Sequence, residues 1–326
     1  MGILESAYKK KFGPEVAERL CKDLRASTRK SFEGIWRKFQ DFLRKEEVQR
    51  ITAGTALNFL EYLFSVRKLS PKTVLCYRNA IAEPLRVTLQ IEVSDRTFNR
   101  LARAQFLARP PNKKTVPNWD VNQVLQKLLQ PDFRLETCSP DNLLAKTAFL
   151  VALATGNRAS ELCAVVRGWI IFRQYSEAIL PVKPNFLFKN QRALRTPPNI
   201  TIKGFAEVDP ELCPLRALRI YLERTRELAE GDALFIHPTS GRNLQRPSLS
   251  LRLTAFISEV IPGSFPKMHD LRKQAASLAW TRGVEPKDIV AAAFWSSSNV
   301  FVKHYLFNPQ ALSMSCVALN HCAPQS

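Results

Sequence analysis

Six polar residues in the second half of the chain have the side chains needed to cut a phosphodiester bond without a metal ion. The set supplies two guanidiniums, an ammonium, an imidazole, an indole N–H and a phenol, from Arg158, Lys189, His269, Arg272, Trp295 and Tyr305. A phenol has a pKa of about 10, so it is a poor nucleophile at neutral pH unless its proton is removed and the phosphate charge is neutralised. Arginines bind phosphate oxygens, and histidine or lysine transfers protons. The set therefore suits attack by a tyrosine on a phosphodiester.

The first guanidinium belongs to a segment where one helix is expected to end and another to begin. Thr155 and Gly156 close an apolar helical run, so a helix starting near Asn157 would hold Arg158 in its first turn. The helix dipole disfavours a cation at that end, whereas a bound phosphate would account for one. Glu161 lies on the same face and could orient a neighbouring cation. The alternative is an ordinary salt bridge at a helix start.

The remaining segments are two further helix starts. His269 and Arg272 are three residues apart and so share a helix face, where an imidazole can transfer protons and a guanidinium can bind phosphate. Trp295 precedes a run of serines that marks the next helix start, and its indole N–H could donate to an anion. Tyr305 follows on that helix. The ordinary alternatives are a capped helix with exposed polar residues and a tyrosine buried for packing.

The elements that must position these residues begin with a basic, helical region. Apolar residues recur at helical spacing from Phe32 to Leu43, and further helices are expected from about Thr55, from Ser70–Pro71 and from about Ser94. Strand-like alternation is missing from this part of the sequence. The pattern predicts a compact, all-helical domain.

The third of these helices has candidate contacts to DNA. Its predicted core face consists of Val74, Tyr77 and Ile81. Lys72 and Arg78 would then be free to point elsewhere, and we take them as candidate groove or phosphate contacts.

A basic, proline-rich stretch interrupts the helical pattern. Residues 109–117 include three prolines and three cations, a composition that excludes a helix. We therefore expect an exposed linker over 109–118, which divides a DNA-binding domain (1–108) from a catalytic domain (119–326). Lys113 and Lys114 in this linker are further candidate DNA contacts.

The second domain mixes helices with short strands. Strands are expected within 169–172, 178–182 and 199–202, because these runs are short and apolar or alternating. Helices are expected over 120–128, 142–153, from Pro214, and over 249–260, 269–282 and 286–294. The sequence therefore predicts a small sheet of about three strands among helices.

Charge and cysteine usage limit the partners and the compartment. The chain has 326 residues, with 48 Lys+Arg against 29 Asp+Glu and a net charge of +19, which favours nucleic acid as the partner. Seven cysteines without a CxxC pair indicate free thiols in a reducing compartment. We find neither a metal-binding motif, nor an apolar run long enough for a membrane, nor a secretory signal. We expect a nuclear protein, or a cytoplasmic one if the source is prokaryotic.

The order of these segments resembles the tyrosine recombinase (phage-integrase-like) family over most of the chain. Residues 154–162, which read Ala-Thr-Gly-Asn-Arg-Ala-Ser-Glu-Leu, are similar to the family's first arginine box, and His269-x-x-Arg272 is similar to its second. Trp295 stands where members have histidine or tryptophan, and Tyr305 stands in the place of the nucleophile. Residues 70–81 are similar to the third helix of the core-binding domain. Residues 213–218 and 295–306 look closest to eukaryotic mobile-element recombinases of the DIRS-like and crypton-like groups.

The resemblance implies a fold and a reaction. The fold would be mainly α with a small antiparallel β-sheet, in which a helical core-binding domain and an α+β catalytic domain form a C-shaped clamp on double-stranded DNA. Without cofactor or metal, Arg158 and Arg272 would bind the non-bridging oxygens, His269 would assist proton transfer and Trp295 would add a neutral donor. Tyr305 would become joined to the 3′ phosphate. A dimer on one site and a tetramer in the synaptic complex would exchange strands through a Holliday intermediate, in integration or excision of mobile DNA.

A lysine completes the implied set by protonating the departing 5′ oxygen. The family has it in the hairpin between the second and third strands, and Lys183, Lys189 and Lys203 all lie near that position. Lys189 ends an extended run and precedes a polar turn, so we select it among the three.

Two other functions and one structural question stay open at this point. A catalytically inactive DNA-binding protein on the same scaffold is the first alternative, and a type IB topoisomerase, which shares the chemistry, is the second. We expect residues 309–319 to form an apolar helix, which would either dock on a neighbouring protomer or cover its own domain.

Overall fold

The computed structural model describes residues 3–110, 119–173, 176–191, 194–295, 297 and 299. The chain divides into two compact units, residues 1–114 and 115–326. Among the described residues, no helix is both long and apolar enough to cross a membrane. Predictions for Lys113, Lys114, Tyr305 and the helix over 309–319 fall outside the described residues.

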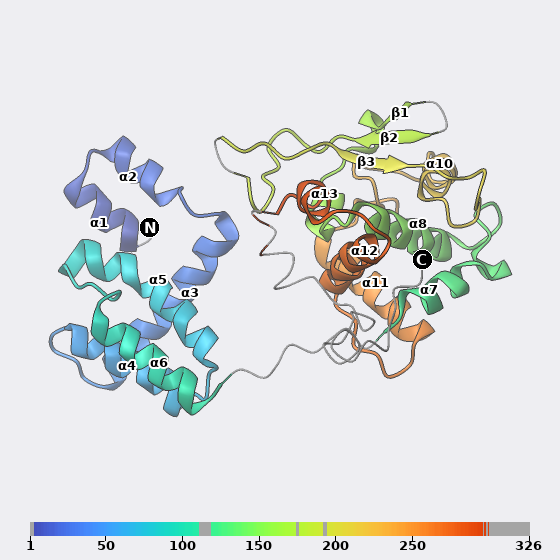
Figure 1. The fold of residues 1–326 in the computed structure, drawn as a ribbon. Coiled ribbons are helices and arrows are strands. Elements are labelled where there is room, and N and C mark those ends of the chain that lie inside the picture. The colour runs from blue at the N-terminus through green and yellow to red at the C-terminus, as the bar shows by residue number, and fades with distance from the viewer. Residues whose placement is uncertain are drawn as a thin grey trace. The chain divides into compact units, whose positions relative to one another are not determined.

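The first unit is helical throughout its described part (Figure 1). Its helices are α1 (Ile3–Lys11), α2 (Pro14–Cys21), α3 (Ala26–Lys45), α4 (Ala53–Ser65), α5 (Pro71–Leu89) and α6 (Arg96–Ala108). The core lies among α3 to α6, where Phe39, Phe59, Ile81 and Phe98 are almost fully buried. The predicted all-helical domain is confirmed, because apolar residues at helical spacing bury one face of each helix against the others.

The start of α5 shows how local sequence sets a helix boundary. Ser70 is the N-cap, and its Oγ accepts a hydrogen bond from the backbone N–H of Thr73 at 3.2 Å. Pro71 follows at the first helical position, where its missing N–H removes no helical bond. The predicted start at this serine and proline is therefore confirmed.

Arg78 is buried, contrary to the expectation that it is free to point away from the core. It belongs to the same stripe of α5 as Val74, Ile81 and Leu85, all of them buried. Its Nε donates to the carbonyl of Val93 at 2.6 Å, and its guanidinium is 5.9 Å from the ring of Phe98. In this structure Arg78 holds the loop after α5 rather than presenting a cation on the surface.

The other candidate contact on α5 and the end of α6 lie nearer to solvent. Lys72 is exposed, as expected for a DNA contact. Helix α6 ends at Ala108, and the next residue, Arg109, donates to the carbonyls of Leu69 and Phe64 at 3.0 and 3.1 Å. The first residue of the predicted linker is thus anchored to the helical unit.

The second unit combines helices with a small sheet (Figure 1). Its helices are α7 (Val121–Leu128), α8 (Pro140–Thr155), α9 (Ala159–Leu162), α10 (Pro214–Arg224), α11 (Arg246–Val260), α12 (Met268–Thr281) and α13 (Pro286–Ala292), with 3-10 turns at Pro131–Phe133 and Arg167–Trp169. Helix α8 is apolar on nearly every side, and it packs against α10, α11, α12 and the sheet. It is the central element of this core.

Three antiparallel strands form the sheet, as predicted. They are β1 (Ile171–Arg173), β2 (Glu177–Leu180) and β3 (Ile200–Lys203), in the order β1-β2-β3. In the pairing of β2 with β3, Ala178 faces Ile202 across the ladder, and Leu180 faces Ile200; all four are buried. Residues along these strands therefore alternate between the buried face and the outer face of the sheet. The long connection between β2 and β3 takes no part in the strand pairing.

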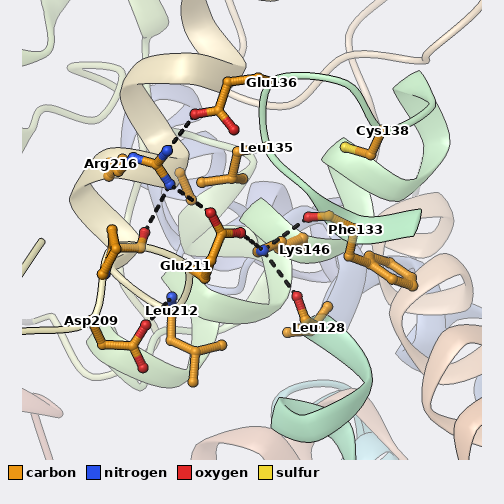
Figure 2. Close-up of polar contacts among 12 residues, drawn as sticks. Leu128, Phe133, Leu135, Glu136, Cys138, Lys146, Asp209, Glu211, Leu212 and Arg216 are labelled. Atoms are coloured by element: carbon orange, nitrogen blue, oxygen red, sulfur yellow. Dashed lines mark hydrogen bonds and ion pairs between the residues drawn. The ribbon is translucent and has the colours of Figure 1, made fainter. Parts of the chain in front are cut away.

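A fully buried lysine joins α8 to the segments around it (Figure 2). Lys146 donates to the carbonyls of Leu128 and Phe133 and to the Glu211 carboxylate, each at 2.9 Å. Glu211 also accepts from Arg216 at 3.2 Å. The ammonium is thus supplied with three acceptors, which a buried charge requires.

Candidate functional site

Glu161 holds Arg158 at the point where α8 ends. Gly156 is left-handed, with φ of 60°, which closes α8, and Arg158 is extended just before the single turn of α9. The buried Glu161 carboxylate accepts from the backbone N–H of Arg158 at 2.8 Å and from its Nη1 at 2.7 Å. Arg158 therefore precedes the helix instead of occupying its first turn, and the carboxylate, not a helix dipole, sets its orientation. The predicted orienting contact from Glu161 is present.

Arg272 reaches the same carboxylate from α12. Its Nη1 donates to the carbonyl of Gly156 at 2.5 Å and lies 3.8 Å from Glu161 Oε2, while its Nη2 donates to the carbonyl of Ala293. The residue is 2% exposed, whereas the side chain of Arg158 is 18% exposed. The two predicted phosphate-binding guanidiniums are thus brought together by one glutamate, although 116 residues separate Arg272 from Gly156.

Trp295 packs beneath Arg272. It is 1% exposed, and the Arg272 guanidinium carbon is 5.1 Å from its ring centroid. The indole belongs to a small cluster with Ala276, Ile289 and Ala293. This geometry is a cation–π contact that supports the guanidinium from within the protein. The structure therefore places the indole inside the fold, beneath the guanidinium of Arg272.

His269 occupies the second position of α12, one turn before Arg272. Partial loss of hydration, followed by the positive charges of Lys273, Arg272 and Arg158, lowers the pKa of His269 to about 4, against the opposing charge of Asp270. A histidine with this pKa is neutral at neutral pH. The neutral form is the one that the predicted assistance to proton transfer needs, and the same shift makes the imidazole a weaker base than an ordinary histidine.

We expect the His269 imidazole to titrate well below the ordinary histidine value of 6.5 in the free protein. Because the folded pKa lies below the unfolded one, the neutral form favours folding above pH 6.5, and this contribution is lost as pH falls toward 4. NMR titration of the imidazole protons would measure it, with His269→Gln to assign the signal. The glutamine variant should also lose less stability than the native chain between pH 6.5 and 4. A titration midpoint at or above 6.5 would contradict the expectation.

Three lysines were candidates for the general acid, and the structure separates them by their contacts. Lys183 forms an ion pair with Asp232 at 2.9 Å. Lys203 is the last residue of β3 and lies opposite Glu177 in the ladder. Lys189 is exposed in the β2–β3 connection, and both of its chain neighbours contact Phe294, next to Trp295. The environment of Lys189 is the one that adjoins the rest of the candidate site.

Two residues of this site were not found from the sequence. Asn190 and Arg195 donate to the carbonyls of Phe294 and Trp295, respectively. Their partners are about a hundred residues away along the chain, so neither periodicity nor a local motif signals the contact.

Comparisons with known proteins agree on the fold. No family model matches the sequence, and no curated protein matches it. Among solved structures, XerH site-specific recombinase bound to a palindromic difH substrate is 16% identical, with a TM-score of 0.64 over 93% of this chain and 83% of that one. The Tn1549 transposon integrase in complex with circular intermediate DNA is 14% identical, with a TM-score of 0.61 over 98% of this chain and 99% of that one. A lambda integrase tetramer bound to a Holliday junction is 14% identical, with a TM-score of 0.50 over 84% of this chain and 70% of that one. The chain therefore has the fold of tyrosine recombinases, as predicted.

Proposed function

We propose that the protein is a site-specific DNA recombinase that cleaves and rejoins strands through a 3′-phosphotyrosyl link at Tyr305. The observation that supports this most directly is the convergence of Arg158 and Arg272 on Glu161, in a fold shared with recombinases that bind DNA. Two guanidiniums at one place supply the charge needed to stabilise a pentacovalent phosphorane. The net charge of +19 provides salt-dependent affinity for the DNA backbone.

In the proposed step, the Tyr305 oxygen attacks the phosphorus and the bond from phosphorus to the 5′ oxygen breaks. The phenolic proton passes to the neutral imidazole of His269, and Lys189 gives a proton to the departing 5′ oxygen. Arg158 and Arg272 bind the non-bridging oxygens. Arg272 is only 2% exposed, so DNA binding would have to uncover its guanidinium before it could reach a phosphate oxygen. Trp295 adds its support to Arg272 and, by resemblance, a neutral donor.

The proposal extends to assembly and biological role. The helical unit and the catalytic unit would close around the duplex as a C-shaped clamp, with exposed Lys72 and the linker lysines at 113 and 114 on the backbone. Two protomers would occupy one site and four would form the synaptic complex. We also propose a role in integration or excision of mobile DNA, and a nuclear location for a eukaryotic source. The grouping with DIRS-like or crypton-like elements rests on sequence resemblance alone.

A covalent-capture assay tests the function. A bound duplex is first selected from a randomised pool with the Tyr305→Phe chain, and the selected site is then nicked beside each candidate scissile phosphate. The native protein should form an adduct that survives denaturation, and Tyr305→Phe should bind equally well and form none. Binding without any adduct on every nicked duplex would favour an inactive DNA-binding protein. Relaxation of plasmid without recombinant products from two sites would favour a topoisomerase.

A further inference from the structure

Three successive carbonyls after α13 each accept a hydrogen bond from a distant side chain. Ala293 O accepts from Arg272 Nη2 on α12. Phe294 O accepts from Asn190 Nδ2 at 2.9 Å, and Trp295 O accepts from Arg195 Nη2. Two of the three donors therefore come from the connection between β2 and β3. A turn held in this way at consecutive residues is fixed in both position and direction.

The middle residue of this turn has an unusual conformation that the contacts maintain. Phe294 has φ of 51°, in the left-handed region, where the Cβ of a residue other than glycine crowds the following carbonyl oxygen. Its ring is buried, lies edge-on to Phe188 at 6.3 Å between centroids, and has the Arg195 guanidinium carbon 4.4 Å from its centroid. Phe294 thus fits between two residues of the β2–β3 connection, and these contacts stabilise the bend.

The two segments joined here are those that bear the proposed acid and nucleophile. Lys189 lies between Phe188 and Asn190, both of which contact Phe294. The turn leads to Trp295 and, ten residues later, to Tyr305. We propose that Asn190 and Arg195 are positioning residues that fix the Lys189 segment against this turn and so place the general acid for the departing 5′ oxygen. This inference rests on the proposed recombinase function.

The part of the connection around Lys189 depends on these contacts, because the backbone bonds that tie the connection to residues 164–166 end at Lys183. Lys189 is nine residues beyond the end of β2 and eleven before β3. The local backbone bonds near it, from Phe186 to Lys183 and from Gln191 to Phe188, close turns within the connection itself. Asn190 and Arg195 instead tie it to another part of the fold. A misplacement of about 1 Å is enough to slow a reaction about 10²-fold, so loss of either contact should appear in the chemical step.

Replacing the leaving 5′ oxygen by sulfur distinguishes a misplaced general acid from a defect in the nucleophile or in phosphate binding. Two nicked duplexes carry the selected site, one with the natural 5′ oxygen at the scissile phosphate and one with sulfur in its place. A thiol has a pKa of about 8.5, so a thiolate leaves without receiving a proton. Adduct formation at saturating protein is measured for Asn190→Leu, Arg195→Met and Arg195→Lys. Lys189→Met is the reference for a missing acid, and Arg158→Lys is the reference for a defect in phosphate binding.

On the oxygen substrate, Asn190→Leu and Arg195→Met should react about 10²-fold more slowly than the native chain. The DNA affinity of Arg195→Met should match that of Arg282→Met, an exposed position that controls for lost charge, and the affinity of Asn190→Leu, which loses no charge, should match that of the native chain. On the sulfur substrate they should recover most of the rate, as Lys189→Met does, whereas Arg158→Lys stays slow on both. Arg195→Lys retains the positive charge and is the conservative variant at this position. Its thermal unfolding should stay close to that of the native chain, which shows that a slow rate does not come from a folding defect.

Two results would overturn the proposed positioning role of Asn190 and Arg195. The first is an equal loss of rate on the oxygen and sulfur substrates, which would mean that the variants disturb the nucleophile or the phosphate. The second is a native rate for all three variants on the oxygen substrate. In both cases the native protein still forms adducts, so the proposed function survives. If the native protein forms no adduct with either duplex, the proposed function itself fails, and the positioning role of Asn190 and Arg195 fails with it.

Discussion

Arg272→Lys should bind the selected DNA nearly as well as the native chain and form the covalent adduct about 10²–10³-fold more slowly, which is the usual effect of losing one preorganised donor. The guanidinium bridges the carbonyls of Gly156 and Ala293, lies beside Glu161 and covers Trp295. A lysine ammonium is a single point charge and cannot occupy all of these positions together. The measurement is the rate of adduct formation at saturating protein, with DNA affinity determined separately.

Arg272→Lys should also destabilise the catalytic unit. At least one buried carbonyl loses its donor, which costs about 2 kcal/mol and lowers the melting temperature of a unit of this size by about 4–8 °C. Arg158→Lys is the matched comparison, because Arg158 is more exposed and contacts the same glutamate. It should react slowly with a smaller change in melting temperature. Native rates for Arg272→Lys, with its fold intact, would remove this residue from the proposed phosphate site.

Local sequence predicted most boundaries of this fold. Ser70 before Pro71 predicted the start of α5, Gly156 predicted the end of α8, and three short apolar runs predicted the three strands. Each depends on a chemical property of adjacent residues: a side-chain cap, a missing Cβ or a period of two. The convergence of Arg158 with Arg272 came only from family resemblance, since no local pattern joins positions more than a hundred residues apart.

The errors have a common physical cause, which is that a polar side chain can be buried when tertiary partners satisfy it. Arg78 was expected outside because Val74, Tyr77 and Ile81 were taken as the core face, yet Arg78 contacts the Val93 carbonyl and the ring of Phe98. Trp295 is almost fully buried because Arg272 covers it from α12, a contact that no local pattern signals. Asn190 and Arg195 gave no signal, because their acceptors are backbone carbonyls, which any residue supplies. A sequence pattern indicates whether a side chain tends to be buried or exposed, but it does not indicate which partner the fold brings to that side chain.

Lys146→Met should lower the free energy of unfolding by about 3 kcal/mol, although methionine is apolar and similar in length. Lys146 is 0% exposed, and its ammonium serves the carbonyls of Leu128 and Phe133 together with Glu211 (Figure 2). Removing it leaves two buried acceptors without this donor and leaves Glu211 with Arg216 as its remaining cation. Equilibrium unfolding in urea would measure the loss.

The pH dependence of this loss identifies the contribution of the charge. Burial raises the pKa of Glu211, but hydrogen bonds and charge from Lys146 and Arg216 outweigh it, so the pKa lies below its ordinary value of 4.5. A carboxylate with a lowered pKa stabilises the fold above its unfolded pKa, and this stabilisation is lost as pH falls through the folded value. The difference between the native chain and Lys146→Met should therefore narrow below about pH 4.5.

A matched ion pair shows whether burial causes the effect. Lys183 and Asp232 form a bridge of the same 2.9 Å length as Lys146 and Glu211, but about half of each side chain is exposed. Lys183→Met should change stability by less than about 1 kcal/mol, because solvent screens an exposed pair. The double variant Lys146→Met/Glu211→Gln should be more stable than Lys146→Met alone, since it removes a carboxylate that has lost one of its two cations and keeps only Arg216. Equal losses for Lys146→Met and Lys183→Met would show that the buried ammonium is not what holds α8 to its neighbours.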